Sequence, residues 1–385
     1  MVIVLVSIAI WAGLLAAHGG FWLASEIDDD DADGADPPLW PEVVAVVPAR
    51  DEAEVVARAV RSLVAQDYPG TFRIVLVDDG SSDGTAGVAL AAAGRSGAGS
   101  GSGRLTVVQG SVPPAGWTGK LSAMQRGVRE AEELSPSARY LWFTDADIEH
   151  APDTLRSLVA RAEEDGLAMS SRMADLRCYS VAERALVPAF VFFFQMLYPF
   201  ARVNRPSSRV AAAAGGCMLV NRASLASAGG LRAIKDEIID DCALGALMKK
   251  EGPIRLTLTR RSRSVRPYEG WRDIGAMISR SAYAQLGYSP LVLLGTLAGM
   301  AIVYVNPVVF ALRGPGWIHA AGCAAWLMMA IAFQPMLRFY RRSPLWGLAL
   351  PAIALFYAVA TFMSAWRHWQ GRGGMWKGRA QSRRT

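Results

Sequence analysis

Acidic residues in three separate groups of this 385-residue chain could take part in chemistry. The first group combines residues 47–52 (Val-Pro-Ala-Arg-Asp-Glu) with residues 77–84 (Val-Asp-Asp-Gly-Ser-Ser-Asp-Gly). Each segment follows an apolar run, and ligands of an open parallel sheet lie beyond the carboxyl ends of its strands. Acidic residues there could accept hydrogen bonds from a base N–H or from ribose hydroxyls. A turn with capping residues would explain Ser81 and Asp83, but not the doubled carboxylate of Asp78 and Asp79.

The second group is the triplet Asp145-Ala146-Asp147, which follows another apolar run. Two carboxylates separated by one residue point from the same side of an extended segment. They form a hard oxygen site suited to Mg²⁺ or Mn²⁺ carrying a diphosphate. Such a triplet often occurs by chance, but its position about sixty-five residues after the doubled carboxylate strengthens the signal.

The third group is Asp240-Asp241, where apolar residues at helical spacing indicate that a helix begins. Acids at a helix start are commonly only partners of the helix dipole. The functional alternative is a general base that takes the proton from an acceptor hydroxyl.

Lys120 lies in a segment, residues 116–122, that looks like part of a P-loop. Pro114 stands where that loop requires its first glycine, and Leu121 stands where it requires Ser or Thr. The pattern therefore does not support an ATPase, although Lys120 could still contact a diphosphate.

The segments that must position these groups alternate between strand and helix patterns from residue 43 to about residue 270. This alternation predicts an α/β domain with a mainly parallel sheet and helices on both faces. The strand candidates are residues 43–47, 74–77, 105–108, 141–144, 168–171 and 217–220.

Apolar segments on both sides of this domain predict a membrane protein. Residues 1–23 carry no charged side chain and would form a helix of roughly 34 Å, so residues 1–25 are expected to be a retained anchor. A cleaved signal peptide is the alternative, but a basic segment and an evident cleavage site are missing. Residues 286–366 contain three candidate spans, at 291–312, 317–337 and 345–366. Residues 186–200 are too short to span and predict either a buried core helix or an interfacial helix.

Charged segments complete this picture. Residues 26–42 contain an acidic stretch that predicts a solvated linker, and residues 367–385 form a basic tail. The tail and the arginines of residues 260–266 are expected to be attracted to anionic lipid headgroups. No motif that reads nucleic acid accompanies them, so no nucleic-acid partner is expected.

Three arginines between the last two spans, at residues 338, 341 and 342, indicate the orientation by the positive-inside rule. They predict a multi-pass protein of the inner (cytoplasmic) membrane with its catalytic domain facing the cytoplasm. Three spans after that domain would place the basic tail outside, so either one segment is re-entrant or the rule fails at this terminus.

Taken together, these segments resemble family 2 glycosyltransferases with the GT-A fold, over roughly residues 43–285. The wider sequence resembles the hopanoid-biosynthesis-associated (hopene-associated) branch. The segments that carry this second resemblance are GWTGKLSAM, TDADIEHAPDTL, AAAAGGCMLVNR, IDDCALGALMKKEG and SRSAYAQLGYSP.

The resemblance implies a GT-A domain that is Rossmann-like, a nucleotide-diphosphate sugar donor and a role for each matching residue. Asp241 would be the catalytic base, and Asp145 and Asp147 would hold the divalent cation, Mg²⁺ or Mn²⁺. The residues implied for the nucleotide-sugar site are Pro48, Arg50, Glu52, Asp78, Asp79, Lys120, Asp145, Gly215, Gly216, Asp240 and Arg280. Some relatives carry a QxxRW motif, of which residues 277–281 keep only Arg280, and this departure argues against processive polymer synthesis.

The implied activity is transfer of a sugar, with inversion, to a lipid acceptor such as a hopanoid at the membrane. Transfer to a polyprenyl phosphate or to a polysaccharide is the alternative enzymatic interpretation. A catalytically silent membrane scaffold is the alternative outside enzymes. A transporter is disfavoured because the spans contain almost no internal polar groups, which translocation pathways require.

Overall fold

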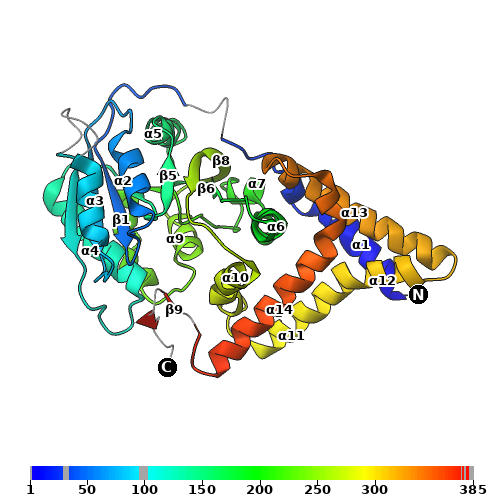
Figure 1. Ribbon diagram of the computed structural model, residues 1–385. Helices are drawn as coiled ribbons and strands as arrows, with labels where there is room; N and C mark the ends of the chain where they lie inside the picture. The colour runs from blue at the N-terminus through cyan, green and yellow to red at the C-terminus, as the bar shows by residue number, and fades with distance from the viewer. Residues whose placement is uncertain (1, 29–33, 95–102, 374, 377–378, 381–385) are drawn as a thin grey trace. The chain divides into compact units, whose positions relative to one another are not determined.

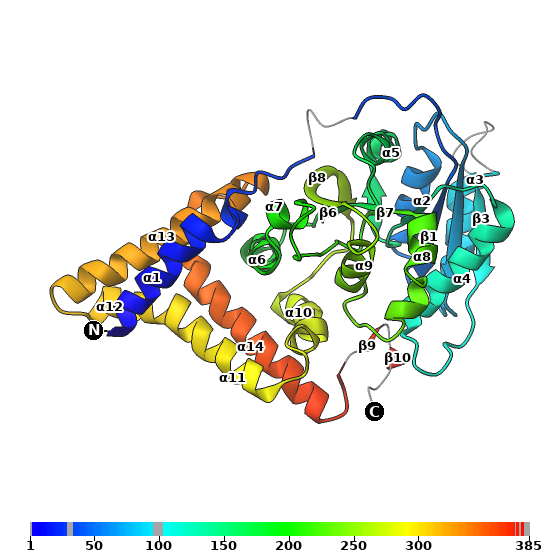
Figure 2. The same cartoon turned by 180° about the vertical axis from the view of Figure 1, so that it is seen from behind.

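The computed structural model of the protein describes residues 2–28, 34–94, 103–373, 375–376 and 379–380. These residues divide into two compact units, which are shown from opposite sides in Figures 1 and 2. We call residues 26–176, 202–266 and 375–385 the α/β unit. We call residues 1–25, 177–201 and 267–374 the helical unit. Most of the predicted basic tail lies outside the described residues.

The α/β unit is built on an eight-stranded sheet with the order β3-β2-β1-β4-β7-β6-β8-β5. The strands are β1 (Val43–Ala49), β2 (Phe72–Asp78), β3 (Leu105–Gln109), β4 (Tyr140–Phe143), β5 (Ile148–His150), β6 (Met169–Asp175), β7 (Met218–Asn221) and β8 (Ile254–Ser264). A separate short hairpin pairs β9 (Met375–Trp376) with β10 (Arg379–Ala380). All six predicted strand segments are therefore confirmed, whereas β5 and β8 were missed.

The prediction of a mainly parallel sheet is confirmed only in part, because the sheet is mixed, with four parallel and three antiparallel pairings. Strands β1, β2, β3 and β4 pair in parallel, as do β6 and β8. Strand β7 runs antiparallel to both β4 and β6, and β5 runs antiparallel to β8. Between β6 and β7 the chain passes through residues 177–201, which belong to the helical unit. The two strands are therefore not joined by a crossover within the α/β unit, which is the connection that parallel neighbours require.

Helices with apolar faces pack against this sheet (Figure 1). They are α2 (Val56–Val64), α3 (Thr85–Gly94), α4 (Gly119–Leu134), α5 (Thr154–Glu164) and α8 (Arg222–Ser227). Helix α9 (Asp240–Met248) contacts the short helix η2 (Leu231–Ile234). Helix α3 contacts the edge strand β3, and α8 contacts β7 (Figure 2). Helix α4 approaches β1 and β2 closely because Gly127 has no side chain. A Cβ atom there would lie 2.4 Å from Val46 Cγ1 and 3.1 Å from Val77 Cγ2.

The acidic linker is not simply solvated, because its first aspartate is buried. Asp28 is 4% exposed and forms an ion pair with Arg172, which is 1% exposed. Backbone hydrogen bonds join Asp28 N to Leu258 O at 2.9 Å and Leu258 N to Glu26 O at 2.8 Å. The buried guanidinium requires a carboxylate partner, and the linker supplies it. Residues 29–33 of the predicted linker lie outside the described residues.

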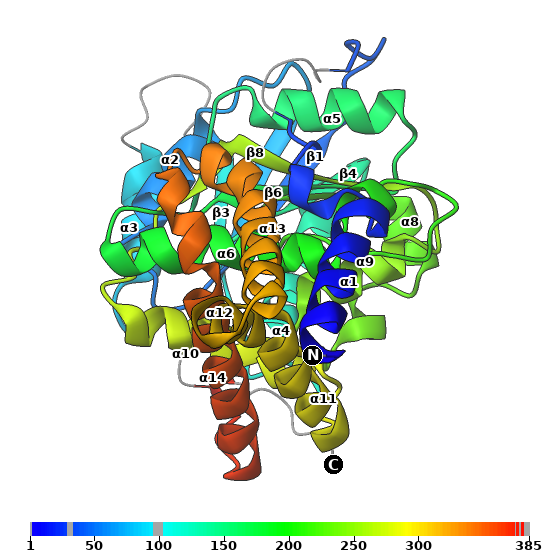
Figure 3. The same ribbon diagram turned by 90° about the vertical axis from the view of Figure 1, so that its right-hand side faces the viewer.

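Among the residues that the structure describes, four helices are long and apolar enough to cross a membrane (Figure 3). They cover Val181–Val203, Pro290–Arg313, Trp317–Phe339 and Pro344–Trp369. The last three agree with the predicted spans, whereas the first extends the segment predicted at 186–200 to a spanning length. The component helices are α6 (Val181–Leu197), α7 (Phe200–Val203), α11 (Pro290–Met300), α12 (Asn306–Arg313), α13 (Trp317–Phe339) and α14 (Leu350–Trp369), with α10 (Trp271–Gln285) preceding α11.

The N-terminal helix is shorter than the sequence suggested. Helix α1 (Val2–Ala17) has 16 residues and is not among the four spanning candidates. It ends before Gly19 and Gly20, which adopt positive φ angles of 66° and 62° and break the helix. Helix α1 packs beside α13 (Figure 3). Its Trp11 Nε1 donates a hydrogen bond of 3.0 Å to Val303 O. Pro307, four residues after Val303, has no backbone N–H and therefore cannot donate to this carbonyl.

The close packing of α4 on the sheet can be tested with Gly127→Ala. The added methyl group would overlap two valine side chains, so we expect the free energy of unfolding to fall by about 2 kcal/mol. Thermal unfolding of the detergent-solubilised protein, followed by tryptophan fluorescence, would measure this loss. Gly87→Ala in α3 is the control, because a Cβ there meets nothing within 4 Å. Equal stability of the two variants would contradict the proposed packing constraint.

Candidate active site

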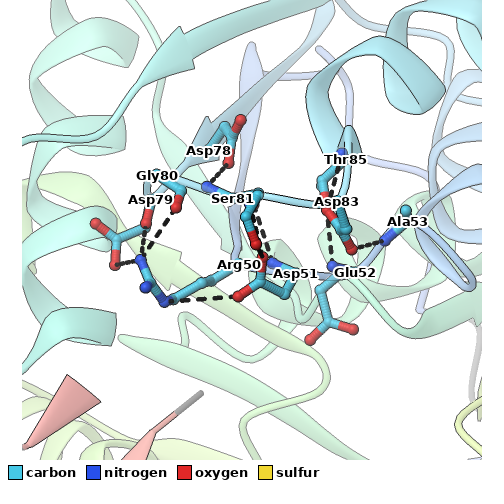
Figure 4. Close-up of polar contacts among 11 residues, drawn as sticks. Arg50, Asp51, Glu52, Ala53, Asp78, Asp79, Gly80, Ser81, Asp83 and Thr85 are labelled. Carbon is cyan, nitrogen blue, oxygen red and sulfur yellow. Dashed lines mark hydrogen bonds and ion pairs between the residues drawn. The ribbon is translucent and has the colours of Figure 1, made fainter. Parts of the chain in front are cut away.

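The ends of β1 and β2 lie side by side and form the first part of the site (Figure 4). Ala49 pairs with Asp78 in the parallel register, so residues 50–52 face residues 79–83. The Arg50 guanidinium donates hydrogen bonds to the backbone carbonyls of Asp79 and Gly80. Its Nη1 also lies 3.9 Å from the Asp79 carboxylate. Arg50 therefore ties the two strand ends together.

Turn contacts use several of the polar side chains in these two segments (Figure 4). Ser81 Oγ accepts from Asp51 N at 3.0 Å, and Asp83 accepts from Ala53 N at 2.9 Å. Asp78 Oδ1 accepts from Ser81 N at 3.0 Å, so this carboxylate also helps to form the turn. The capping interpretation fits Asp83, whose Oδ1 accepts from Thr85 N at 3.0 Å at the start of the next helix, whereas Ser81 contacts the end of β1 instead. The buried side chain of Asp79 instead lies beside Arg50.

Arg266 connects two predicted site residues that come from different segments. Its Nη2 atom lies 2.6 Å and 2.7 Å from the two carboxylate oxygens of Glu52. Its Nε atom lies 2.7 Å from Asp147 Oδ2. Burial alone would lower the pKa of Arg266, but the charges of Asp147 and Glu52 raise it above its ordinary value. The guanidinium therefore remains charged, and the two acids share its single positive charge.

Sequence reasoning missed Arg266 because it treated residues 260–266 as a basic stretch facing lipid. The structure instead places most of this stretch in β8, where Arg261 lies 3.6 Å from Asp153 and Arg263 lies 3.8 Å from Asp175. Alternating apolar residues at Ile254, Leu256 and Leu258 were the signal that could have revealed this strand.

Lys120 lies at the start of α4 and joins the second and third acidic groups. Its ammonium nitrogen lies 3.0 Å from Asp145 Oδ1 and 3.1 Å from Asp240 Oδ2. Burial would lower the pKa of Lys120, but the charges of Asp145, Asp240 and Asp241 raise it above its ordinary value. Lys120 is therefore a permanent cation between carboxylates that come from separate elements.

Asp241 lies at the start of α9 and has an unusual proton affinity. Its Oδ2 accepts from Gly215 N at 3.1 Å, and its Oδ1 accepts from Cys242 N at 2.8 Å. Burial, followed by the charge of Asp240, raises the pKa of Asp241 from 3.8 to about 6. The helix-start interpretation accounts for the contact with Cys242, but the contact with Gly215 comes from another segment. A carboxylate of this pKa can act as a proton acceptor near neutral pH.

The two glycines that precede β7 adjoin these charged groups. A Cβ on Gly215 would lie 3.4 Å from Lys120 Nζ and 3.5 Å from Asp241 Oδ2. A Cβ on Gly216 would lie 3.2 Å from Ile148 Cδ1. Gly216 O accepts a hydrogen bond of 2.9 Å from Thr144 Oγ1, immediately before the acidic triplet. The absence of side chains therefore leaves room beside Lys120 and Asp241.

Buried His150 forms a hydrogen bond to Thr144, the residue that precedes the acidic triplet. Its Nε2 shares a hydrogen bond of 2.8 Å with Thr144 Oγ1, and its Nδ1 shares one of 2.9 Å with Ser262 Oγ. Burial and the charge of Arg172 lower the pKa of His150 to about 3, so the ring is neutral at physiological pH. We interpret His150 as a structural link between β4, β5 and β8.

The acidic triplet by itself is a sparse metal site. Within the described residues, no group of three or more His, Cys, Asp and Glu side chains is placed to hold a metal ion. Asp145 and Asp147 can offer only carboxylate oxygens from two side chains. Magnesium is often bound by one or two carboxylates, with phosphate and water completing its shell. The donor chemistry therefore fits a divalent cation that arrives with a diphosphate.

Most of the predicted site residues lie in the α/β unit, where their network consists of three separate sets of contacts. Asp79 contacts Arg50, and Glu52 joins Asp147 through Arg266. Lys120 joins Asp145 to Asp240, next to Asp241 and Gly215. Pro48 lies within β1, beyond the residues of this strand that pair with β4. Arg280 is exposed on α10 in the helical unit, so the network does not include it.

The role of Lys120 in charge balance can be tested with Lys120→Met. Without the ammonium, three neighbouring acids repel one another when ionised, and we expect a stability loss of about 2 kcal/mol at pH 8. Since Lys120 lowers the pKa of Asp241, its removal should let this acid protonate at higher pH. The loss should therefore shrink as the pH falls from 8 to 5. Thermal unfolding across this range would measure it.

Lys250→Met removes the same charge from an exposed position and serves as the control. It should leave stability nearly unchanged at every pH. A pH-independent loss in Lys120→Met would show that lost packing, rather than charge, explains its effect.

Comparisons with known proteins agree with this geometry. Residues 44–228 match the model of the family described as "Glycosyl transferase family 2". No curated protein matches the chain. Among solved structures, the chain is similar to a mannosyltransferase from Pyrobaculum calidifontis in complex with GDP-Man and Mn²⁺. The two share 20% sequence identity over 95% of this chain and 98% of that chain, with a TM-score of 0.56, and this likeness shows a common fold.

More distant similarities are also found. Glucosyl-3-phosphoglycerate synthase from Mycobacterium tuberculosis, in complex with phosphoglyceric acid, is 18% identical over 64% of this chain and 79% of that chain, with a TM-score of 0.40. TarS 1-349 from S. aureus, in complex with UDP-GlcNAc, is 13% identical over 86% of this chain and 92% of that chain, with a TM-score of 0.39. The family match carries the conclusion: residues 44–228 are a glycosyl transferase family 2 domain, and the protein is a glycosyltransferase.

Proposed function

We propose that the protein transfers a sugar from a nucleotide-diphosphate sugar to a hydroxyl group of a membrane lipid, with inversion at the anomeric carbon. The observation that carries this proposal is the contact network around Lys120. In this network Lys120, a permanent cation, contacts Asp145 of the acidic triplet and Asp240, the neighbour of the weakly acidic Asp241. Lys120 and the triplet lie within residues 44–228, which match the glycosyl transferase family 2 model. A single displacement requires these three functions, which are stabilisation of the leaving group, donor binding and proton acceptance.

Donor binding would use the strand ends and the acidic triplet. The similar mannosyltransferase structure contains GDP-Man and Mn²⁺, which supports a nucleotide-diphosphate donor and a divalent cation for this chain as well. Arg50, Glu52 and Asp79 would line the nucleotide pocket. Asp145 and Asp147 would hold the cation, which when bound supplies positive charge to the diphosphate.

Transfer itself would depend on Lys120 and Asp241. Lys120 would neutralise the charge that grows on the diphosphate as the sugar departs. Asp241 would accept the proton of the attacking hydroxyl, and its hydrogen bond from Gly215 N would fix the direction of the carboxylate. Gly215 and Gly216 leave room beside these groups for the sugar and the acceptor.

A lipid acceptor is supported by the helical unit and by the sequence. Four helices are apolar enough to cross a membrane, which would keep the enzyme where lipid hydroxyls are available. The resemblance to the hopanoid-associated branch makes a hopanoid or a related hydroxylated lipid the acceptor that we favour. The arginines at 338, 341 and 342 support a cytoplasmic orientation of the α/β unit at the inner membrane.

The acceptor class can be tested with a radiolabelled sugar. Membranes that contain the protein would receive labelled GDP-mannose or UDP-sugars together with Mn²⁺, followed by chloroform extraction. We expect the label to enter the chloroform phase and to resist mild acid, which cleaves sugars from polyprenyl phosphates but not from lipid alcohols. Label that enters only water-soluble polymer, or only an acid-labile lipid, would contradict a lipid-alcohol acceptor. Membranes that contain the Asp241→Asn variant provide the matched control.

The role of Asp241 predicts a characteristic pH dependence. Asp241→Asn should bind nucleotide normally but lose transfer by about 10³-fold, because it cannot accept a proton. In the unmodified enzyme kcat/KM should fall about tenfold per pH unit below pH 6, as Asp241 becomes protonated. Asp240→Asn removes the neighbouring charge that raises the pKa of Asp241. The kcat/KM of this variant should therefore begin to fall at a lower pH than that of the unmodified enzyme. Full activity of Asp241→Asn would exclude Asp241 as the base.

A further inference from the structure

The contacts of Arg266 suggest a role that charge balance alone does not explain. Its guanidinium binds Asp147, an expected cation ligand, through Nε and binds both oxygens of Glu52 through Nη2. The side chains of Asp147 and Glu52 are only 14% and 10% exposed. A divalent cation that binds Asp147 Oδ2 would therefore meet a positive group already in contact with that oxygen.

The backbone around this contact is held by hydrogen bonds, whereas the arginine side chain is partly exposed. Val265 N donates a hydrogen bond of 2.9 Å to Asp147 O, and Ser264 pairs with Ile148 between β8 and β5. Glu52 N is held at 2.9 Å by Thr85 Oγ1. Movement of the strand therefore cannot free Asp147. Rotation of the Arg266 side chain, which is 29% exposed, can do so.

We propose that Arg266 occupies the Asp147 carboxylate until the donor binds, and thereby makes cation binding depend on nucleotide binding. The inference rests on the proposed function, in which Asp147 holds a cation. An arriving diphosphate offers oxygens to the guanidinium, which matches phosphate as well as it matches carboxylate. Arg266 then releases Asp147 while Glu52 keeps the side chain nearby. A cation without a nucleotide must instead displace Arg266 unaided.

This coupling is reciprocal by thermodynamic necessity. The cation should strengthen nucleotide binding by the same factor by which the nucleotide strengthens cation binding. Lys120 makes an equivalent contact with Asp145, but it also contacts Asp240 and is the more deeply buried cation. Arg266 is therefore the side chain whose removal tests the inference with the smaller disturbance.

The test is direct measurement of Mn²⁺ binding to the full-length protein in detergent, by the EPR signal of free Mn²⁺. Without nucleotide, Arg266→Gln should bind Mn²⁺ about tenfold more tightly than the unmodified protein, because no charged hydrogen bond must be broken. Adding GDP or UDP should tighten Mn²⁺ binding strongly in the unmodified protein and only slightly in Arg266→Gln. Arg263→Gln is the matched control, since it removes the same charge from β8 at a residue paired with Asp175.

Two further variants keep the result interpretable. Arg266→Lys retains the charge but lacks the planar guanidinium, so it should bind Mn²⁺ about threefold more tightly than the unmodified protein. This variant replaces Arg266→Gln in the test if Arg266→Gln does not fold. Asp147→Asn should abolish the tight binding. If Asp147→Asn abolishes binding but neither Arg266 variant improves it, the inference is overturned and the proposed cation site stands. If Asp147→Asn binds Mn²⁺ like the unmodified protein, both the inference and that cation site are overturned.

Discussion

The contact of the Lys120 ammonium with Asp145 and Asp240 is the interaction on which the arrangement of the site depends. These two acids come from segments almost a hundred residues apart, and each adjoins another acid. Partly buried carboxylates that approach so closely would protonate or move apart without a cation between them. Lys120 removes this conflict while leaving Asp241 with a raised pKa. The single positive charge of Lys120 thus allows the carboxylates to lie close together and leaves Asp241 able to accept a proton.

The framework around this contact consists of strand ends and helix starts rather than long loops. Arg50 joins the ends of β1 and β2, and Gly127 allows α4 to lie close to the same strands. Lys120 is the second residue of α4, so this packing also determines where the ammonium lies. Arg266 provides a second cation from the end of β8. The two cations are therefore positioned by the sheet and the helix that packs on it, which would suit the highly charged donor of the proposed function.

The sequence was sufficient for local elements and for the three acidic groups, but not for how distant segments pair. Apolar runs with turn residues on either side predicted six strands correctly, and the acidic triplet followed β4 as expected. Strand β8 was missed because the charges of residues 260–266 obscured the alternation that precedes them. The direction of β7 depends on where the chain travels after β6, which no local pattern records. Asp28 was assigned to solvent because its partner, Arg172, lies 144 residues away in the sequence.

The buried pair of Asp28 and Arg172 also affects how the α/β unit can be handled in isolation. Residues 26–28 bond to β8 almost as an additional short strand segment, so the linker belongs structurally to the domain that follows it. A shortened protein that starts at the first predicted strand, residue 43, would leave a guanidinium enclosed without its counter-ion. Such a fragment would be expected to aggregate even though it retains every residue of the candidate site. The boundary of a stable catalytic fragment therefore lies before Glu26, on the N-terminal side of the acidic stretch.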